Sequence, residues 1–154
     1  MLTLTKKTEY ALIAVSHLAR RRGQVVSARD IAERYGVRLP LLMNVLKILM
    51  HNRILTSVRG TGGGYRLVGE PEQISLSQIV DAVEGPPRFV RCVGHEELHR
   101  THQCELIGTC PIRTPLLRMH ERFQKFLTGL TVADVAADES GEQDDRDGAL
   151  KVLA

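Results

Sequence analysis

Three cysteine thiols lie within 19 residues of one another, at Cys92, Cys104 and Cys110. Eleven residues separate the first two and five separate the last two, and the longer gap holds His95, His99 and His102. Structural zinc sites usually use closely spaced cysteine pairs, which are absent, and an odd number of cysteines makes a poor disulfide framework. Thiolates on a long loop are typical of an iron-sulfur cluster that needs a fourth ligand. The spacing leaves four alternatives: an iron-sulfur cluster, a zinc site, a thiol redox switch or structural cysteines.

A glycine-rich stretch, SVRGTGGGYRLV from Ser57 to Val68, is the second candidate for chemistry. Such runs can cradle phosphates, but nucleotide-binding glycine loops lead into a helix. Here β-branched or aromatic runs flank the glycines, which predicts a β-hairpin with a five-residue loop from Gly60 to Gly64. Glycine allows a positive φ at the tip and close approach of the backbone to a phosphate or groove. Nucleotide binding is therefore disfavoured, and Arg59 and Arg66 flank a tip suited to an anionic partner.

The residues before the hairpin predict three helices. Apolar residues recur at helical spacing from Thr5 to about Arg21. Ser27 is an N-cap and Gly36 a C-terminal left-handed residue for a short second helix. A third helix follows from about Leu39 to Asn52, with a proline in its first turn. A short helix, a turn and a second helix form a helix-turn-helix. The fold class is therefore mainly α with a small β-hairpin, a winged helix-turn-helix.

The third helix carries one polar stripe on an otherwise apolar surface. Asn44, Lys47 and His51 are three and four residues apart, so they share a face. Amide, ammonium and imidazole groups suit base edges and phosphates, although an ordinary solvated face has the same pattern. We expect contacts with double-stranded DNA from the helix and the hairpin at Pro40, Leu41, Asn44, Lys47, His51, Arg59, Gly62, Gly63 and Arg66.

The charge distribution also favours a polyanionic partner. From Asp138 onward the chain holds six acidic and two basic side chains, a charge of −4, whereas the whole chain carries +3. The other 137 residues therefore carry about +7. The first apolar run is interrupted by Lys6, Lys7 and Glu9, so no signal peptide is predicted, and no run is long enough for a membrane span. We expect a cytoplasmic protein with no membrane partner.

The second half of the chain predicts two further helices and the cysteine segment between them. ISLSQIVDAVEG has a capping box at Ser75 and Gln78 and ends at Gly85. A long apolar helix from about Arg113 to Leu130 is too apolar to stand alone and suits a dimer interface. We predict a winged helix-turn-helix domain over 1–85, a cysteine-bearing cluster loop over 86–111, a dimerisation helix region over 112–137 ending in a short turn capped by Thr131, and a disordered acidic tail over 138–154.

Together these motifs resemble the Rrf family of winged-helix transcriptional regulators, over about residues 2–135. The resemblance rests on LTKKTEYAL, VSARDIAERYGV, SVRGTGGGYRL and ISLSQIVDAVEG followed by a three-cysteine loop. It implies a homodimer that binds palindromic operators and has no catalytic activity or small-molecule substrate. Many members hold a 2Fe-2S or 4Fe-4S cluster on the loop cysteines and sense iron-sulfur status, iron, nitric oxide or redox state.

Carried over by position, the resemblance implies Cys92, Cys104 and Cys110 as cluster ligands. The usual gap between the first two cysteines is shorter than the eleven residues found here. IscR-like members use a histidine three residues after the last cysteine, a position that Arg113 occupies in this chain. NsrR-like members use an acidic residue in the first helix of the partner subunit, which matches Glu9.

The sequence leaves several alternatives open. If Glu9 is not a ligand, it is a first-turn acid favoured by the helix dipole, and the fourth ligand is a histidine of the longer gap. With Glu9 as a ligand, the donor set favours 4Fe-4S over 2Fe-2S. A zinc- or thiol-switched DNA-binding protein is the alternative without a cluster, and an enzyme using the cysteines is disfavoured because no general base is placed beside them.

Overall fold

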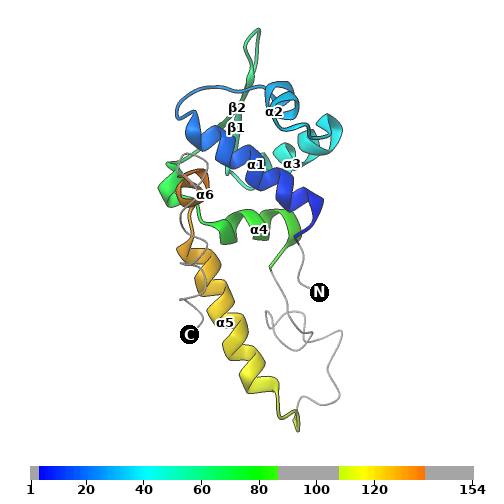
Figure 1. Cartoon of the computed structure of the whole chain (residues 1–154), viewed down its shortest axis with the longest axis vertical. Helices are drawn as coiled ribbons and strands as arrows, with labels where there is room; N and C mark the ends of the chain where they lie inside the picture. The colour runs from blue at the N-terminus through cyan, green and yellow to red at the C-terminus, as the bar shows by residue number, and fades with distance from the viewer. Residues whose placement is uncertain (1–3, 87–107, 138–154) are drawn as a thin grey trace.

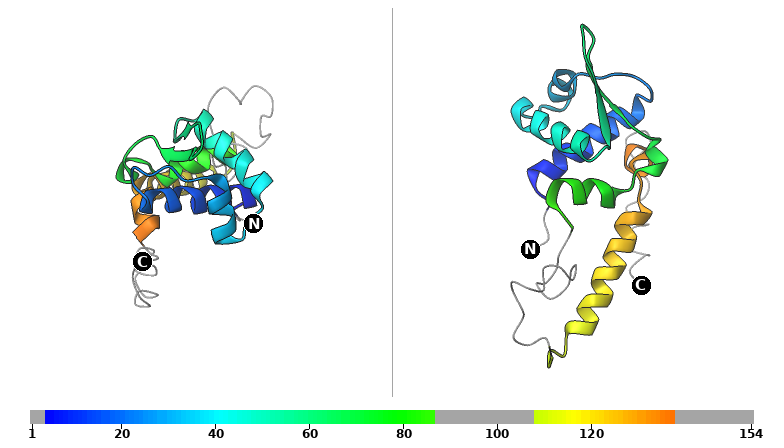
Figure 2. Two further views of the ribbon diagram at one scale, coloured as in Figure 1. Left: turned by 90° about the horizontal axis from the view of Figure 1, so that it is seen from above. Right: turned by 180° about the vertical axis from the view of Figure 1, so that it is seen from behind.

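The computed structural model describes residues 4–86 and 108–137. Helices α2, α3 and the β-hairpin group at one end of the long axis, and α5 extends toward the other end (Figures 1 and 2). This mainly helical arrangement with one hairpin is the predicted one. The elements of the described residues are α1 Lys6–Arg20, α2 Ala28–Tyr35, α3 Leu39–His51, β1 Leu55–Val58, β2 Gly64–Leu67, the 3-10 turn η1 Pro71–Gln73, α4 Leu76–Glu84, α5 Arg113–Gly129 and α6 Val132–Ala137.

Capping residues set the helix ends close to their predicted places. Ser27 Oγ accepts a hydrogen bond from the backbone of Asp30 at 3.1 Å, and Gly36, at φ 62°, ends α2 in the left-handed region. In the capping box of α4, Gln78 N donates to Ser75 Oγ at 3.3 Å and Ser75 N donates to Gln78 Oε1 at 2.9 Å. Helices α1, α3 and α5 each end one residue before the predicted last residue, which is within the usual uncertainty of helix ends.

Helix α1 lies at the centre of the core. It packs against α3, α4 and α6, and its apolar face is closed to solvent. Helix α3 contributes four buried apolar side chains to this core, whereas Met43 on the same helix is exposed. The fully or almost fully buried members are Ala11, Ala14, Val15, Leu18, Ile31, Leu42, Val45, Leu46, Leu49, Ile79 and Val132.

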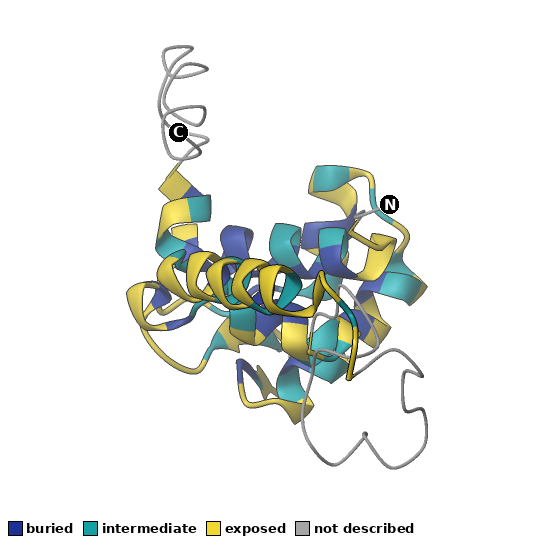
Figure 3. Ribbon diagram, turned by 90° about the horizontal axis from the view of Figure 1, so that it is seen from below, coloured by how far each residue is buried: buried dark blue, intermediate teal, exposed yellow. Residues whose placement is uncertain are grey.

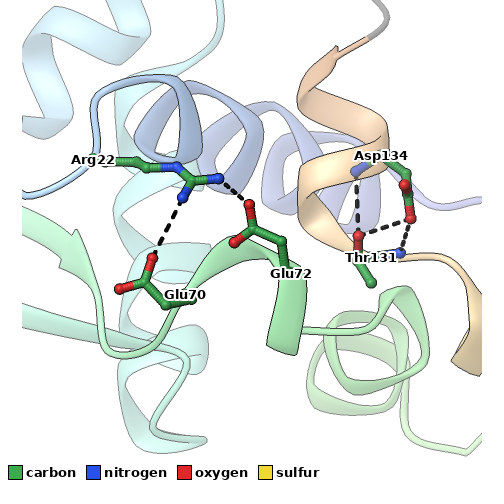
Figure 4. A network of polar contacts seen from close by, with 5 residues as sticks. All are labelled: Arg22, Glu70, Glu72, Thr131 and Asp134. Atoms are coloured by element: carbon green, nitrogen blue, oxygen red, sulfur yellow. Dashed lines mark hydrogen bonds and ion pairs between the residues drawn. The ribbon is translucent and has the colours of Figure 1, made fainter.

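The short C-terminal helix α6 returns to this core after α5 has left it. Val132 has no exposed surface, and its backbone N–H donates to Ile74 O at 2.8 Å. Thr131 and Asp134 cap α6, with the Thr131 hydroxyl donating to the Asp134 carboxylate at 2.7 Å (Figure 4). Hydrogen bonds from Thr131 hold the pKa of Asp134 below its usual value. Residues up to Ala137 therefore help to build the same core as α1 and α3.

The long helix α5 leaves a wide apolar surface open to solvent. Helix α5 contacts α4 and extends away from the other helices (Figure 1), and most of its residues are exposed (Figure 3). Ile112, Met119 and Phe126 are 57%, 45% and 54% exposed, so large apolar side chains run from its start almost to its end. The three side chains are seven residues apart, so they lie on one exposed apolar stripe along α5.

Arg53, just after α3, has an unusual backbone conformation. Its φ is 58°, in the left-handed region that favours glycine, and its N–H donates to Met50 O at 3.0 Å to close the helix end. We predict that Arg53→Gly raises the free energy of unfolding by up to about 1 kcal/mol, because it relieves this strain. Urea unfolding of both proteins measures the difference.

Lys47→Gly is the matched control for that substitution. Lys47 is exposed in the middle of α3, where glycine lowers stability by about 1 kcal/mol relative to a good helix former. The two substitutions should therefore shift the urea midpoint in opposite directions. A fall in stability for Arg53→Gly as large as that for Lys47→Gly would contradict a strained Arg53.

Candidate nucleic-acid interface and cluster ligands

The polar stripe of α3 faces solvent. Asn44, Lys47 and His51 are all exposed, while the other side of the helix is buried against α1. At the start of the helix Pro40 is exposed and Leu41 is half-buried. The stripe is therefore free to enter a groove without disturbing the core, as a DNA-reading helix must.

Three hydrogen bonds from side chains of α1 position α2 and α3. The Tyr10 hydroxyl accepts a hydrogen bond from the backbone N–H of Arg38, the N-cap of α3, at 3.2 Å. The buried imidazole of His17 meets the Tyr35 hydroxyl at 3.0 Å, and Arg20 donates to the same oxygen at 3.3 Å. Burial lowers the pKa of His17, and nearby arginines lower it further, so the ring is neutral at pH 7. Helix α1 thus holds the helix-turn-helix on both sides of its turn, at the end of α2 and at the start of α3.

The hairpin forms with a register shifted by one residue from the predicted loop. Leu55 pairs with Leu67 and Val58 pairs with Gly64, so the loop runs over 59–63 and Gly64 belongs to β2. The predicted loop over Gly60 to Gly64 was wrong by that residue. Gly64 belongs to the strand through its pairing with Val58, and its neighbour Tyr65 makes a second backbone pairing outside the hairpin.

That second pairing fastens the hairpin to the loop before α2. Val26 N donates to Tyr65 O at 3.0 Å, and Tyr65 N donates to Val26 O at 2.8 Å. The backbones approach so closely that a Cβ on Gly64 would lie 2.3 Å from Val26 O. This role of Gly64 was not predicted from the sequence, in which the third consecutive glycine was the available signal.

The hairpin tip carries the remaining predicted DNA-binding residues. Arg59, Gly62 and Arg66 are exposed and Gly63 is half-buried. Gly60 and Gly62 have φ of 114° and 134°, and Gly63 N donates to Gly60 O at 2.9 Å to close the turn. The glycines therefore form a narrow tip with Arg59 at its base, whereas Arg66 lies further along β2, opposite Thr56.

One basic residue near the stripe, Arg38, was not predicted from the sequence. Arg38 is exposed and directly precedes the first turn of α3, next to Pro40. The N-terminal end of a helix attracts phosphate through its free N–H groups and its dipole. Arg38 adds a positive charge at this end. Its place as the N-cap of the predicted helix was the signal that could have identified it.

Two of the four predicted cluster ligands lie within the described residues. The Cys110 thiol is half-buried, forms no disulfide and lies three residues before α5. Glu9 is half-buried in the first turn of α1, and its carboxylate is 2.6 Å from Lys6 Nζ. Cys92 and Cys104, together with His95, His99 and His102, lie outside the described residues.

The available donors fit an iron-sulfur cluster in their chemistry. Three thiols of one chain and a carboxylate make up the four ligands such a cluster takes, and the Cys110 thiol is partly exposed and forms no disulfide. Within residues 4–86 and 108–137, no three His, Cys, Asp or Glu side chains converge on one point.

Glu84 forms a contact that the sequence did not indicate. Its carboxylate accepts hydrogen bonds from the hydroxyls of Thr5 and Thr8, and these donors hold the pKa of Glu84 below its usual value. Thr8 has no exposed surface. Glu84 is the last residue of α4, so the contact joins the start of α1 to the point where the chain enters the cysteine segment.

Comparison with known proteins identifies the relatives of this arrangement. Residues 4–138 match the Rrf2 family, described as iron-dependent transcriptional regulators. This chain belongs to the Rrf2 family. The HTH-type transcriptional regulator IscR of Aliivibrio salmonicida is 31% identical over 142 residues, covering 91% of this chain and 80% of that protein. The IscR of Serratia proteamaculans is 33% identical, covering 86% of this chain and 77% of that protein.

Solved structures of Rrf2 proteins share the fold. CymR, the global cysteine regulator of B. subtilis, superimposes with a TM-score of 0.70 at 26% identity and covers 90% of this chain and 98% of its own. T. potens IscR gives a TM-score of 0.69 at 25% identity, with 97% and 96% covered. As an Rrf2 protein the chain is a winged helix-turn-helix, DNA-binding transcriptional regulator and not an enzyme. No helix among the described residues is long and apolar enough to cross a membrane.

Proposed function

We propose that this Rrf2 protein is a cytoplasmic homodimer that reads a palindromic operator and responds to an iron-sulfur cluster. The observation that carries the DNA part is the exposed stripe of α3, at the same end of the molecule as the hairpin tip (Figure 2). In this proposal Asn44 and its neighbours on α3 read the major groove. The tip, with Arg59 and Arg66, follows the backbone or enters the adjacent minor groove.

The dimer part rests on the exposed apolar side of α5. A second copy of the chain covers Met119 and Phe126 in this proposal, because equivalent helices can bury the same stripe against each other around a two-fold axis. The two copies of α3 then meet half-sites about 34–36 Å apart, or a multiple of that distance. A small change in the relative orientation of the two subunits therefore alters the affinity for the operator.

The sensing part assigns the cluster to Cys92, Cys104 and Cys110 of one subunit and Glu9 of the other. When bound, the cluster supplies a centre that reacts with oxidants or nitric oxide, or that is lost when iron is scarce. The described contacts support a route from it to DNA. Glu84, at the start of the cysteine segment, accepts hydrogen bonds from Thr5 and Thr8 at the start of α1. Tyr10, two residues after Thr8, accepts a hydrogen bond from the N-cap of α3.

The first test of this function compares two residues of the α3 stripe. Lys47→Ala should weaken operator binding and lower its salt dependence by about one counterion, because an ammonium neutralises a phosphate. Asn44→Ala should cost about 1–3 kcal/mol at a single base position, because an amide can pair with one adenine edge. Fluorescence anisotropy over a salt series, with single-base operator variants, separates the two effects. Unchanged binding in both variants would make the stripe an ordinary solvated face.

The second test concerns the cluster. Protein purified without oxygen should absorb between about 320 and 460 nm and bleach with dithionite or nitric oxide. Glu9→Ala should change that spectrum and reduce the ratio of holo to apo operator affinity, a coupling typically of about 1–3 kcal/mol. Glu33→Ala, an exposed acid on α2, is the control and should leave both quantities unchanged.

The alternative outcomes of this test are distinct. A colourless protein with one zinc per chain, or with none, would favour the zinc- or thiol-switched regulator. A coloured protein in which Glu9→Ala has no effect would place the fourth ligand elsewhere, with the three histidines of the longer gap as the first residues to replace.

A further inference from the structure

A cavity of about 440 Å³ lies between the end of α3, the root of the hairpin, η1 and α4. Its size is in the range of small-molecule sites. Two of its apolar side chains, Ile54 and Ile74, are buried, and its polar side chains are exposed to solvent. The lining residues are Asn52, Arg53, Ile54, Val68, Gly69, Gln73, Ile74, Gln78, Asp81 and Ala82. None of them belongs to the proposed DNA surface or cluster site.

Two opposite charges line this cavity without pairing. Arg53 and Asp81 both border it, yet no ion pair joins them or engages either one within the described residues. Asp81 accepts one long hydrogen bond, at 3.3 Å, from the Ser77 hydroxyl. The backbone of Arg53 is in the left-handed region, where glycine is less strained, so the fold carries this guanidinium at a cost in stability.

The side-chain amides around the cavity keep free hydrogen-bonding groups. The Gln78 carbonyl is used by Ser75 N, which leaves its NH₂ group available. The Asn52 NH₂ group donates to Ile48 O at 2.9 Å, which leaves its carbonyl available. The cavity therefore offers a cation, an anion, an amide donor and an amide acceptor above an apolar floor.

We propose that this cavity binds a small zwitterion of the α-amino-acid class. Arg53 pairs with the carboxylate in a two-point contact, Asp81 pairs with the ammonium group, and the amides take the remaining polar atoms. The apolar floor at Ile54 and Ile74 accepts the side chain of the ligand. A simple anion would be repelled by the negative charge of Asp81, and a simple cation would be repelled by the positive charge of Arg53. Only a ligand with both charges satisfies the site.

The test is calorimetric titration of the full chain with each of the twenty common amino acids, with acetate and methylamine as single-charge probes. At least one amino acid should bind with a Kd of about 1 mM or tighter, and the single-charge probes should bind far more weakly. Arg53→Gly and Asp81→Asn should each weaken binding on the order of tenfold or more, because each removes a charged hydrogen-bonding partner. Arg53→Gly suits the local φ, so loss of binding in it cannot be assigned to unfolding.

Arg29→Ala and Glu33→Gln, exposed substitutions on α2, serve as matched controls and should keep wild-type affinity. The proposal is overturned if no amino acid binds at about 10 mM, or if Arg53→Gly and Asp81→Asn both bind as the wild type does. It is also overturned if acetate binds as tightly as the best amino acid, since the cavity is then only an anion site. None of these outcomes depends on a cluster or on an operator.

Discussion

Gly64→Ala should separate the hairpin from the body of the protein and abolish specific operator binding. A Cβ at this position would lie 2.3 Å from Val26 O, 2.5 Å from its carbonyl carbon and 2.9 Å from Ser27 N. All three are backbone atoms, so no side chain can rotate away to make room. We expect a loss of about 1–3 kcal/mol in the free energy of unfolding, the usual cost of overpacking. Urea unfolding and an operator titration measure the two effects.

Gly69→Ala is the control in the same part of the chain. The nearest atom to its added Cβ is Gln73 Oε1 at 3.9 Å, which is ordinary contact with a flexible side chain. Its stability should stay within about 0.5 kcal/mol of the wild type, with full operator affinity. If Gly64→Ala matched this control in both measurements, the pairing of Val26 with Tyr65 would not hold the hairpin in place.

Ending the chain after Leu130 should destroy cooperative folding. This truncation removes α6, whose Val132 is completely buried against the core and bonded through its backbone to Ile74. Losing this helix uncovers part of α1 and leaves the Ile74 carbonyl without its partner. We expect a loss of about 2–5 kcal/mol or more, comparable with the whole stability of a small domain. Circular dichroism during heating measures the transition.

Ending the chain after Ala137 is the matched control, because it keeps α6 and the contact of Arg20 with Ala136 O at 3.3 Å. This shorter chain should melt within a few degrees of the full protein, because we expect its free energy of unfolding to change by about 0.5 kcal/mol or less. A cooperative transition at the wild-type temperature in the chain ending at Leu130 would show that α6 is dispensable.

The sequence predicted those features that depend on neighbouring residues. Ser27 and Gly36 mark the ends of α2 because capping is a local hydrogen-bonding problem. The polar stripe of α3 follows from helical periodicity alone. The hairpin followed from β-branched runs on either side of glycine, although the loop boundary did not, since Gly64 pairs with Val58 inside β2.

Features that depend on tertiary contacts could not be predicted in this way. Glu84 reaches Thr8 across 76 positions, and nothing around either residue indicates the other. The same holds for Val132, whose burial against α1 depends on the path that α5 takes. Arg53 had a partial signal, because it occupies a position after a helix where glycine is usual. The candidate cavity also gathers residues from four separate elements, so no single stretch of sequence reveals it.

The packing of α6 on α1 has a consequence for how the protein is made. The ribosome delivers α1 first, and α6 emerges only after another 117 residues, from Arg20 to Ala137. At a synthesis rate of about 5–20 residues per second, this delay is roughly 6–23 s. Throughout it the apolar face of α1 lacks its last cover. Because α1 also packs against α3, we expect that operator binding through α3 begins only once synthesis has passed Ala137, so that an unfinished chain would not compete for an operator.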